Sequence, residues 1–301
     1  MRYGYACINL SLGEKIRVNR GMIKRTFLSK GLNYVSELAY QNILDMQKIV
    51  EWNVKNDILA YRMSSDMFPW FTEYEFKQLP NYEKIVDKLS EIGNYSKEND
   101  LRLSFHPGPF NCLASPTESV VEKTISELEK HSQIMDFMNL EKTPNSKINI
   151  HVGGAYGDKK KTAKRFCENW NKLSDNLKSR LTVENDDKSS LFTTKDLYDL
   201  VYKNIKIPLV FDYLHHRLKN DGDSEEEALK MAISTWKGYI PCVHFSSSKK
   251  IFENKEGTNI KEQAHADYIY EEIKTYGEDL CIILESKAKD LAVIKYKTNK
   301  L

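Results

Sequence analysis

Histidines and carboxylates recur at the ends of short apolar runs in this 301-residue chain. The residues of this set are His106, His151, Glu184, Asp212, His215, His244, His265 and Glu285. Imidazole and carboxylate together suit Zn²⁺, Mn²⁺ or Fe²⁺, whereas an all-oxygen set would suit Mg²⁺ or Ca²⁺. One such residue at a strand end is ordinary, but the repetition predicts a site for two or three divalent ions. Sites of that kind are suited to phosphodiester hydrolysis.

The elements that must position these residues are eight apolar, β-branched or aromatic runs, typical of buried strands. They cover residues 2–8, 58–63, 101–105, 147–150, 180–184, 207–211, 240–245 and 280–285. Helical spacing of apolar residues fills 39–55 and 119–138, and Thr193 is a candidate helix start. Strand alternating with helix predicts one α/β domain over 1–301, a TIM (β/α)₈ barrel, in which strand ends converge on one face.

The bulk composition restricts the class of protein. Forty-one per cent of the residues are apolar and 29% are charged, which suits one large core, and no run is long enough to span a bilayer. The start of the chain lacks a secretory signal, so we expect an intracellular protein, in the cytoplasm or nucleoid. The five cysteines form no CxxC pair, which argues against a disulfide framework or a thiolate zinc site.

A glycine-rich turn followed by a basic run favours a polyanionic partner. Gly153 and Gly154 allow close backbone approach, and a following helix start would attract phosphate. The cations there are Lys159, Lys160, Lys161, Lys164 and Arg165, although most such runs are simply solvated helix faces. Tyr5, Phe110, Tyr156 and Tyr213 lie near strand ends and could stack on bases or serve in packing. His131 is expected to be a packed or solvated helix residue, and His216 at most supports a metal ligand.

Several longer motifs make the chain recognisable. They are GYACINLSLG near the start, SFHPG, HVGGAYGDK, LTVENDD, VFDYLHH, VHFSSS and LESKAKD. Through them the chain resembles the UV-damage endonuclease (UvdE) family over nearly its whole length. The resemblance implies a TIM barrel akin to that of endonuclease IV, with up to three divalent ions, usually Mn²⁺, although Zn²⁺, Mg²⁺ or Co²⁺ would also fit. It also implies a DNA repair enzyme that nicks damaged double-stranded DNA immediately 5′ to pyrimidine dimers and 6-4 photoproducts, leaving a 3′-hydroxyl and a 5′-phosphate.

Residue by residue, the resemblance places the family's metal ligands on the same eight positions. Among them we expect Glu184, Glu285 and Asp212 to act in catalysis. The family's lesion-side tyrosine and asparagine match Tyr5 and Asn9.

The chain departs from the family pattern at two places. Pro109 and Phe110 stand where the family commonly has Gln-Tyr, so the lesion preference is open. Cys242 stands where the family has a lysine that can be carboxylated, so the metal cluster could differ. Two alternatives therefore remain: a weakly cleaving relative that binds damaged DNA, and a metal-dependent barrel sugar isomerase. A monomer fits an enzyme that wraps a bent duplex.

Overall fold

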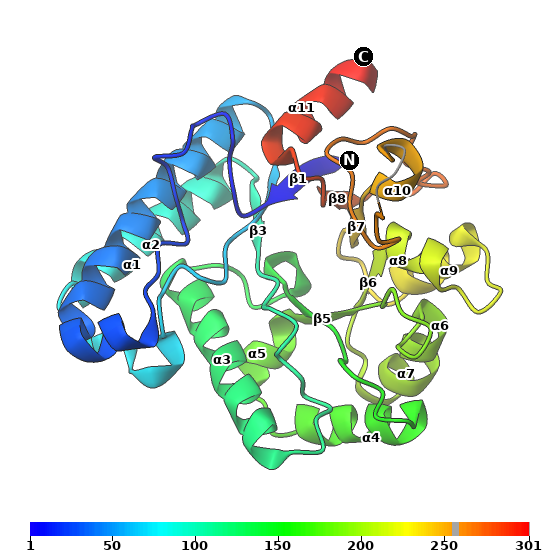
Figure 1. The fold of residues 1–301 in the computed structure, drawn as a ribbon, viewed down its shortest axis with the longest axis horizontal. Coiled ribbons are helices and arrows are strands. Elements are labelled where there is room, and N and C mark those ends of the chain that lie inside the picture. The colour runs from blue at the N-terminus through cyan, green and yellow to red at the C-terminus, as the bar shows by residue number, and fades with distance from the viewer. Residues whose placement is uncertain (255–258, 301) are drawn as a thin grey trace.

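The structure is a computed structural model, and it describes residues 1–254 and 259–300. Eight parallel strands form the centre of the molecule (Figure 1). The strands are β1 (Arg2–Ala6), β2 (Ala60–Arg62), β3 (Arg102–Ser104), β4 (Ile148–Ile150), β5 (Leu181–Glu184), β6 (Leu209–Asp212), β7 (Cys242–Phe245) and β8 (Cys281–Leu284). Their order is β3-β2-β1-β8-β7-β6-β5-β4, and a single parallel bridge between Phe105 and Ile148 joins the two ends. All eight predicted strands are present, and the predicted α/β barrel is confirmed.

Helices surround this ring. They are α1 (Lys24–Lys55), α2 (Tyr82–Glu98), α3 (Glu118–Phe137), α4 (Lys159–Trp170), α5 (Asp175–Arg180), α6 (Thr194–Leu197), α7 (Lys203–Ile205), α8 (Tyr213–Leu218), α9 (Glu225–Ile233), α10 (Lys249–Phe252) and α11 (Lys289–Lys300). Shorter turns are η1 (Phe71–Glu73), η2 (Phe76–Gln78), η3 (Pro144–Ser146) and η4 (Tyr198–Tyr202). Thr193 caps α6 as expected, accepting a hydrogen bond from the Asp196 amide. Among the described residues, no helix is both long and apolar enough to cross a membrane.

Side chains alternate between the two faces of each strand, and this alternation separates two buried regions. The larger region lies between strands and helices and includes Ile148 and Ile150 of β4. The smaller apolar cluster includes Cys242 and Cys281, which are register partners on β7 and β8. Side chains cross the interior of the ring, as where Lys147 meets His244 of β7. The interior of this barrel is therefore partly polar.

Helix α3 packs against the ring through a buried histidine. His131 is fully buried, and its ring makes edge-on contacts with Phe71 and Phe105 at centroid distances of 5.1 and 4.9 Å. Its Nδ1 lies 2.9 Å from the Glu127 carbonyl oxygen. The packing role expected for His131 is therefore confirmed.

Candidate metal centre and DNA-facing surface

Glu184, the last residue of β5, is the centre of the candidate site. Its side chain is 1% exposed. Its Oε2 lies 3.1 Å from His106 Nε2 and 3.0 Å from His244 Nδ1, and its Oε1 lies 3.5 Å from His215 Nδ1. His151 Nε2 lies 3.9 Å from Oε2. Four of the predicted ligand histidines therefore surround one carboxylate, because the strands that precede them are parallel and end on the same face.

Two groups of side chains are close enough to hold metal ions. The first is His106, His151 and Glu184, and the second is Glu184, Asp212 and His215; within each group the ligand atoms lie within 4.8 Å of one another. Glu184 belongs to both groups. Its two oxygens could bridge a pair of ions, an arrangement typical of sites with two metals.

Unpaired buried atoms also fit a cation. Among the described residues, Asp212 Oδ2, His151 Nδ1 and His244 Nδ1 are buried and make no well-aligned hydrogen bond, although His151 Nδ1 lies 3.1 Å from Asp186 Oδ1. His244 Nδ1 lies within 3.0 Å of a carboxylate oxygen but makes no hydrogen bond to it. Buried polar atoms are normally satisfied, so Asp212 Oδ2, which faces no partner in the described part of the chain, indicates a place for a ligand or water. The nitrogen and oxygen donors present suit Mn²⁺, Zn²⁺ or Co²⁺.

Local backbone structure positions the second group. Asp212 ends β6 and also caps α8, where its Oδ1 accepts a hydrogen bond of 2.8 Å from the His215 backbone amide. His215 Nδ1 lies 2.8 Å from the Asn185 carbonyl oxygen, which fixes the orientation of the ring. The cap leaves Asp212 Oδ2 free to face the cluster.

The three remaining predicted ligands lie beside these groups. His244 Nδ1 lies 3.3 Å from Glu285 Oε1, and His265 Nδ1 lies 3.7 Å from Glu285 Oε2 and 2.8 Å from its carbonyl oxygen. Arg62, at the end of β2, donates a hydrogen bond to Glu285 Oε1. The structure thus brings all eight predicted ligands together and adds a cation that the sequence prediction did not include.

Charge interactions strongly perturb the pKa values of these groups. Burial opposes protonation of His151, but the carboxylates of Glu184 and Asp186 outweigh it and raise the pKa of His151 to about 9. For His215, burial is likewise outweighed by Asp212 and Glu184, and its pKa rises to about 10. Burial dominates for His106 and lowers its pKa to about 4. Burial would raise the pKa of Glu184, but the surrounding histidines, His244 foremost, hold it well below its usual value.

Two supporting residues of the site were missed in the sequence. Lys147 is fully buried with its Nζ 3.2 Å from His244 Nε2, and Asn149 donates a hydrogen bond to Glu184 Oε2. Both precede His151 at even spacing, which places the three side chains on one face of β4. The sequence prediction did not include Lys147 and Asn149, because it treats KINI (147–150) as one of the apolar strand runs although two of its four residues are polar. Cys242, the residue in place of the family's lysine, is buried opposite Cys281, its register partner on β8.

The loop after β3 carries the most exposed aromatic ring of the predicted DNA-contacting set. Phe110 is 89% exposed, and Pro109 before it is also exposed. Across the neighbouring loop Tyr156 is 51% exposed, with the Arg165 guanidinium 5.4 Å from its ring centroid. Gly153 has a φ of 93°, and a Cβ there would lie 3.0 Å from Cys112 Sγ. Phe110 and Tyr156 are therefore available to a partner at the mouth of the barrel.

The basic run forms the start of α4, as expected, but it is partly neutralised. Lys159 pairs with Asp196 at 2.6 Å, and Lys164 lies 3.8 Å from Glu168. The Lys161 amide already donates to the Asp158 carboxylate that caps the helix. Lys160 and Lys161 are exposed and make no ion pair among the described residues. Only part of the predicted phosphate-binding run is thus unpaired.

Tyr5 and Asn9, the predicted lesion contacts near the N-terminus, are buried. The Tyr5 hydroxyl donates to Asn53 Oδ1 at 2.7 Å and accepts from Asn9 Nδ2 at 2.8 Å. Tyr213 is also buried, with its hydroxyl donating to the Lys274 carbonyl oxygen. In this structure these three side chains serve in packing and face no solvent.

The fold and site define a (β/α)₈ barrel with a histidine–carboxylate cluster at its strand ends. The model of the family described as UV-endonuclease UvdE matches residues 1–301, and the chain belongs to this family. It is 35% identical over 301 residues to the UV DNA damage endonuclease of Clostridium perfringens, covering 98% of this chain and 69% of the relative. It is 33% identical to the UV-damage endonuclease of Schizosaccharomyces pombe, but covers only 50% of that protein.

Solved structures agree with this family assignment. The crystal structure of SacUVDE matches with a TM-score of 0.86 at 33% identity, over 100% of both chains. Endonuclease IV from Thermus thermophilus matches over 100% of both chains with a TM-score of 0.57, but at 14% identity it shows the shared fold alone. The expected kinship with endonuclease IV-type barrels is confirmed at the level of the fold.

Proposed function

We propose that this protein is a metal-dependent DNA repair endonuclease that nicks duplex DNA immediately 5′ to UV photoproducts, leaving a 3′-hydroxyl and a 5′-phosphate. The supporting relatives are named as UV damage endonucleases. The observation that carries the proposal is Glu184, which belongs to both groups of potential metal ligands. A single domain of 301 residues, acting as a monomer inside the cell on damaged double-stranded DNA, fits this function.

The donor set is the basis for the metal part of the proposal. Two or three ions, Mn²⁺ by preference, would be held by the eight clustered histidines and carboxylates and would polarise the phosphodiester and stabilise the departing oxygen. Glu184 would anchor both ions of a pair, with Asp212 and Glu285 on its flanks. Arg62, which holds Glu285 in place, is a cation directed at the same cluster.

The substrate part of the proposal depends on the groups around the mouth. Phe110 and Tyr156 present aromatic faces that can stack on unpaired bases of any sequence. Lys160 and Lys161 are exposed cations on α4, which begins beside the loop that follows His151. Pro109 offers no amide hydrogen, so recognition here relies on stacking more than on hydrogen bonds to the lesion.

The test is an incision assay on a 5′-labelled, UV-irradiated duplex with added Mn²⁺. We expect one discrete nick beside each photoproduct, a 3′ end that a polymerase extends and a 5′ end that a ligase accepts. An unirradiated duplex and chelation by EDTA are the controls, and neither should show the nick. Retarded mobility without a nick would overturn the nuclease proposal in favour of a damage-binding relative. Turnover of ketoses without DNA binding would favour a sugar isomerase.

A further inference from the structure

A second basic surface lies on a different chain segment from α4, between β1 and the first turns of α1. Residues 15–30 contain six basic residues and no acidic one: Lys15, Arg17, Arg20, Lys24, Arg25 and Lys30. The whole chain carries a net charge of only +2, so this segment is a strong local concentration of positive charge. We name it the β1–α1 basic segment.

Most of these cations have no acidic partner. Among the described residues, no carboxylate lies within 4 Å of the side-chain nitrogens of Lys15, Arg17, Lys24, Arg25 or Lys30, and only Arg20 forms an ion pair, with Asp45 at 2.6 Å. Lys15, Arg17, Lys24 and Arg25 are all exposed. On α4, by contrast, two of the five cations are paired. The β1–α1 basic segment therefore offers more uncompensated charge than the run that sequence motifs pointed to.

The topology places this segment on the same face of the barrel as the metal centre. It covers the second half of the connection from β1 to α1 and the start of α1, and the carboxyl ends of the strands of a (β/α)₈ barrel lie on one face with the connections that follow them. Cys7, at the end of β1, hydrogen-bonds through its amide to the carbonyl of Arg62, whose side chain holds Glu285. The strand that precedes the segment is therefore joined to the predicted ligand cluster through Cys7 and Arg62.

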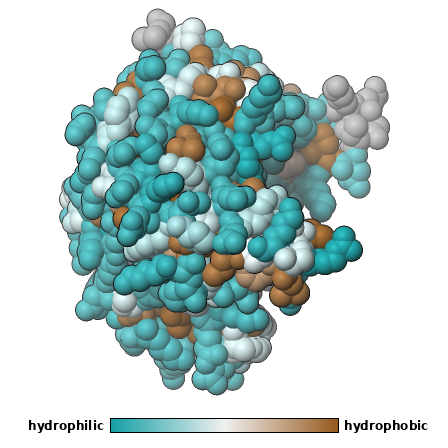
Figure 2. Space-filling view, turned by 90° about the vertical axis from the view of Figure 1, so that its left-hand side faces the viewer, coloured by the Kyte–Doolittle hydropathy of each residue, from teal (hydrophilic) through white to brown (hydrophobic). Residues whose placement is uncertain are grey.

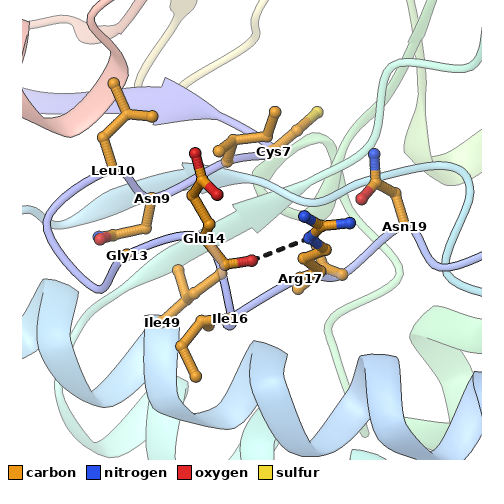
Figure 3. Close-up of a pocket in the computed structure, with 11 residues that line it drawn as sticks. Cys7, Asn9, Leu10, Gly13, Glu14, Ile16, Arg17, Asn19 and Ile49 are labelled. Atoms are coloured by element: carbon orange, nitrogen blue, oxygen red, sulfur yellow. Dashed lines mark hydrogen bonds between the residues drawn. The ribbon is translucent and has the colours of Figure 1, made fainter.

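The backbone of the segment is held in place. Arg17 Nε donates to the Glu14 carbonyl oxygen at 2.8 Å, and both residues line a pocket of about 600 Å³ with Ile16 and Ile49 at its α1 side (Figure 3). Arg20 reaches the carbonyl oxygens of Lys15 and Arg17. The loop that carries Lys15, Arg17 and Arg20 is consequently ordered, which reduces the entropy lost when a partner binds.

The chemistry of the surface fits a nucleic-acid backbone. The side of the molecule formed by α1 is predominantly hydrophilic, with apolar residues scattered over it (Figure 2). Ile23 and Leu28 are exposed there, and Lys24 and Arg25, which follow Ile23 in the sequence, are exposed as well. Exposed cations without acidic partners, on the face of the barrel that carries the candidate metal centre, complement the regularly spaced phosphates of duplex DNA.

We propose that the β1–α1 basic segment binds the sugar–phosphate backbone of the DNA substrate, as a contact surface separate from α4. This inference rests on the proposed function, because it takes duplex DNA as the substrate. Phosphate contacts carry no sequence or lesion information, so the segment would strengthen binding to damaged and undamaged duplexes equally.

The test compares two triple variants of the full chain with the same change in charge. The first is Lys15→Ala, Lys24→Ala and Arg25→Ala, three side chains without an acidic partner. The matched control is Lys55→Ala, Lys142→Ala and Lys172→Ala, exposed lysines that lie in segments leading into strands, at the other end of the barrel. Dissociation constants for irradiated and unirradiated duplexes are measured from low to high salt, and thermal melting verifies that both variants are folded.

For the first variant we expect the slope of log affinity against log salt to become shallower by about 2 to 3, since each phosphate contact contributes roughly 0.9. Affinity at low salt should fall roughly tenfold or more for both duplexes, with their ratio unchanged. The control should match the wild type. Equal behaviour of the two variants would overturn the inference, as would a loss confined to irradiated DNA.

Two further outcomes separate this inference from the proposed function. If the wild type nicks irradiated DNA but the first variant binds DNA like the control, the inference about the β1–α1 basic segment is wrong and the proposed endonuclease function is supported. If the wild type neither binds nor nicks the duplex, the function fails and the inference fails with it. The last arm measures binding to vesicles of phosphatidylcholine and phosphatidylserine. If the first variant loses vesicle binding, the control keeps it and the DNA affinity of both is unchanged, the segment would instead be assigned to a membrane surface.

Discussion

Lys147 and His244 meet inside the barrel, where Lys147 Nζ lies 3.2 Å from His244 Nε2 while Nδ1 of the same ring faces Glu184 and Glu285. Burial lowers the pKa of Lys147 from its ordinary value. Lys147 thus supports the ring from its Nε2 side, in an orientation that directs Nδ1 toward the two carboxylates of the candidate metal site.

The first prediction concerns this contact. Lys147→Met removes the partner of His244 Nε2, and loss of such a supporting group typically weakens metal binding about 10- to 100-fold. Titration of the metal-free variant with Mn²⁺ by calorimetry measures the change. The exposed Lys142→Met variant should bind Mn²⁺ like the wild type, and an unchanged affinity in Lys147→Met would contradict the role assigned here.

Glu184→Gln tests the centre of the cluster. The substitution keeps the shape of the side chain but removes the charge that serves both ligand groups, so we expect nicking to fall at least about a hundredfold. Affinity for irradiated duplex should stay within about threefold, because Glu184 is buried beneath the surface that DNA would contact. Exposed Glu83→Gln is the matched control. Nicking at the wild-type rate by Glu184→Gln would remove Glu184 from the catalytic set.

Phe110→Ala tests the exposed ring at the tip of the β3–α3 loop. Base stacking is worth about 1–3 kcal/mol, so affinity for irradiated duplex should fall about 5- to 150-fold. Phe110→Tyr should retain binding, and folding stability should not change because the ring is 89% exposed. Tyr239→Ala, an exposed aromatic in the segment that leads into β7, provides the control. Gel-shift measurements decide the point, and equal losses in the two alanine variants would argue against stacking at Phe110.

Metal binding should strengthen as pH rises. In the metal-free protein the carboxylates raise the pKa of His151 to about 9 and of His215 to about 10, so both rings hold a proton at neutral pH. A metal ion binds the unprotonated ring and must displace these protons. We expect apparent Mn²⁺ affinity to increase up to pH 9–10, with proton release at pH 7 detected by calorimetry in buffers of different ionisation enthalpy. A flat pH profile would show that these rings are not ligands.

The same raised pKa values predict the opposite trend for the stability of the metal-free protein. A raised folded-state pKa contributes stability that is fully present below the unfolded value of about 6.5. That contribution declines as pH rises above about 6.5 and is lost once pH has risen through the folded values of 9 and 10. Thermal melting with EDTA should therefore show a decline over this range that is absent in the metal-loaded protein.

His131 should make the protein sensitive to acid. Burial lowers its pKa to about 4, so the unfolded chain takes up a proton near pH 6.5 that the folded chain does not. Stability should fall as pH decreases from 6.5 to 4, by roughly 3 kcal/mol for this group. His131→Leu should show a flatter urea-melting profile over this range. His106, with a similar pKa, titrates in both proteins and so cancels in the comparison.

The fold could be predicted from the sequence because the buried strands are bounded by polar residues and are followed by segments in which apolar residues recur at helical spacing. The ligand cluster followed from topology, since parallel strands in a barrel end together. Lys147 and Asn149 could not be found by searching for apolar strands, because the interior of this ring accepts polar side chains that face one another. Burial of Tyr5 was equally hidden, because it depends on Asn53 of α1, 48 residues away in the sequence.

The bridge between Phe105 and Ile148 is the weakest join of the ring, because β3 and β4 share a single bridge there. The two ligands that flank it, His106 and His151, belong to the same potential metal group. An ion bound by both would cross-link β3 to β4 across this join and raise the free energy of local opening. Loading with metal would then slow amide hydrogen exchange at residues 105 and 148–150 more than elsewhere in the barrel. The metal ion would in that case stabilise the closure of the barrel in addition to its role in catalysis.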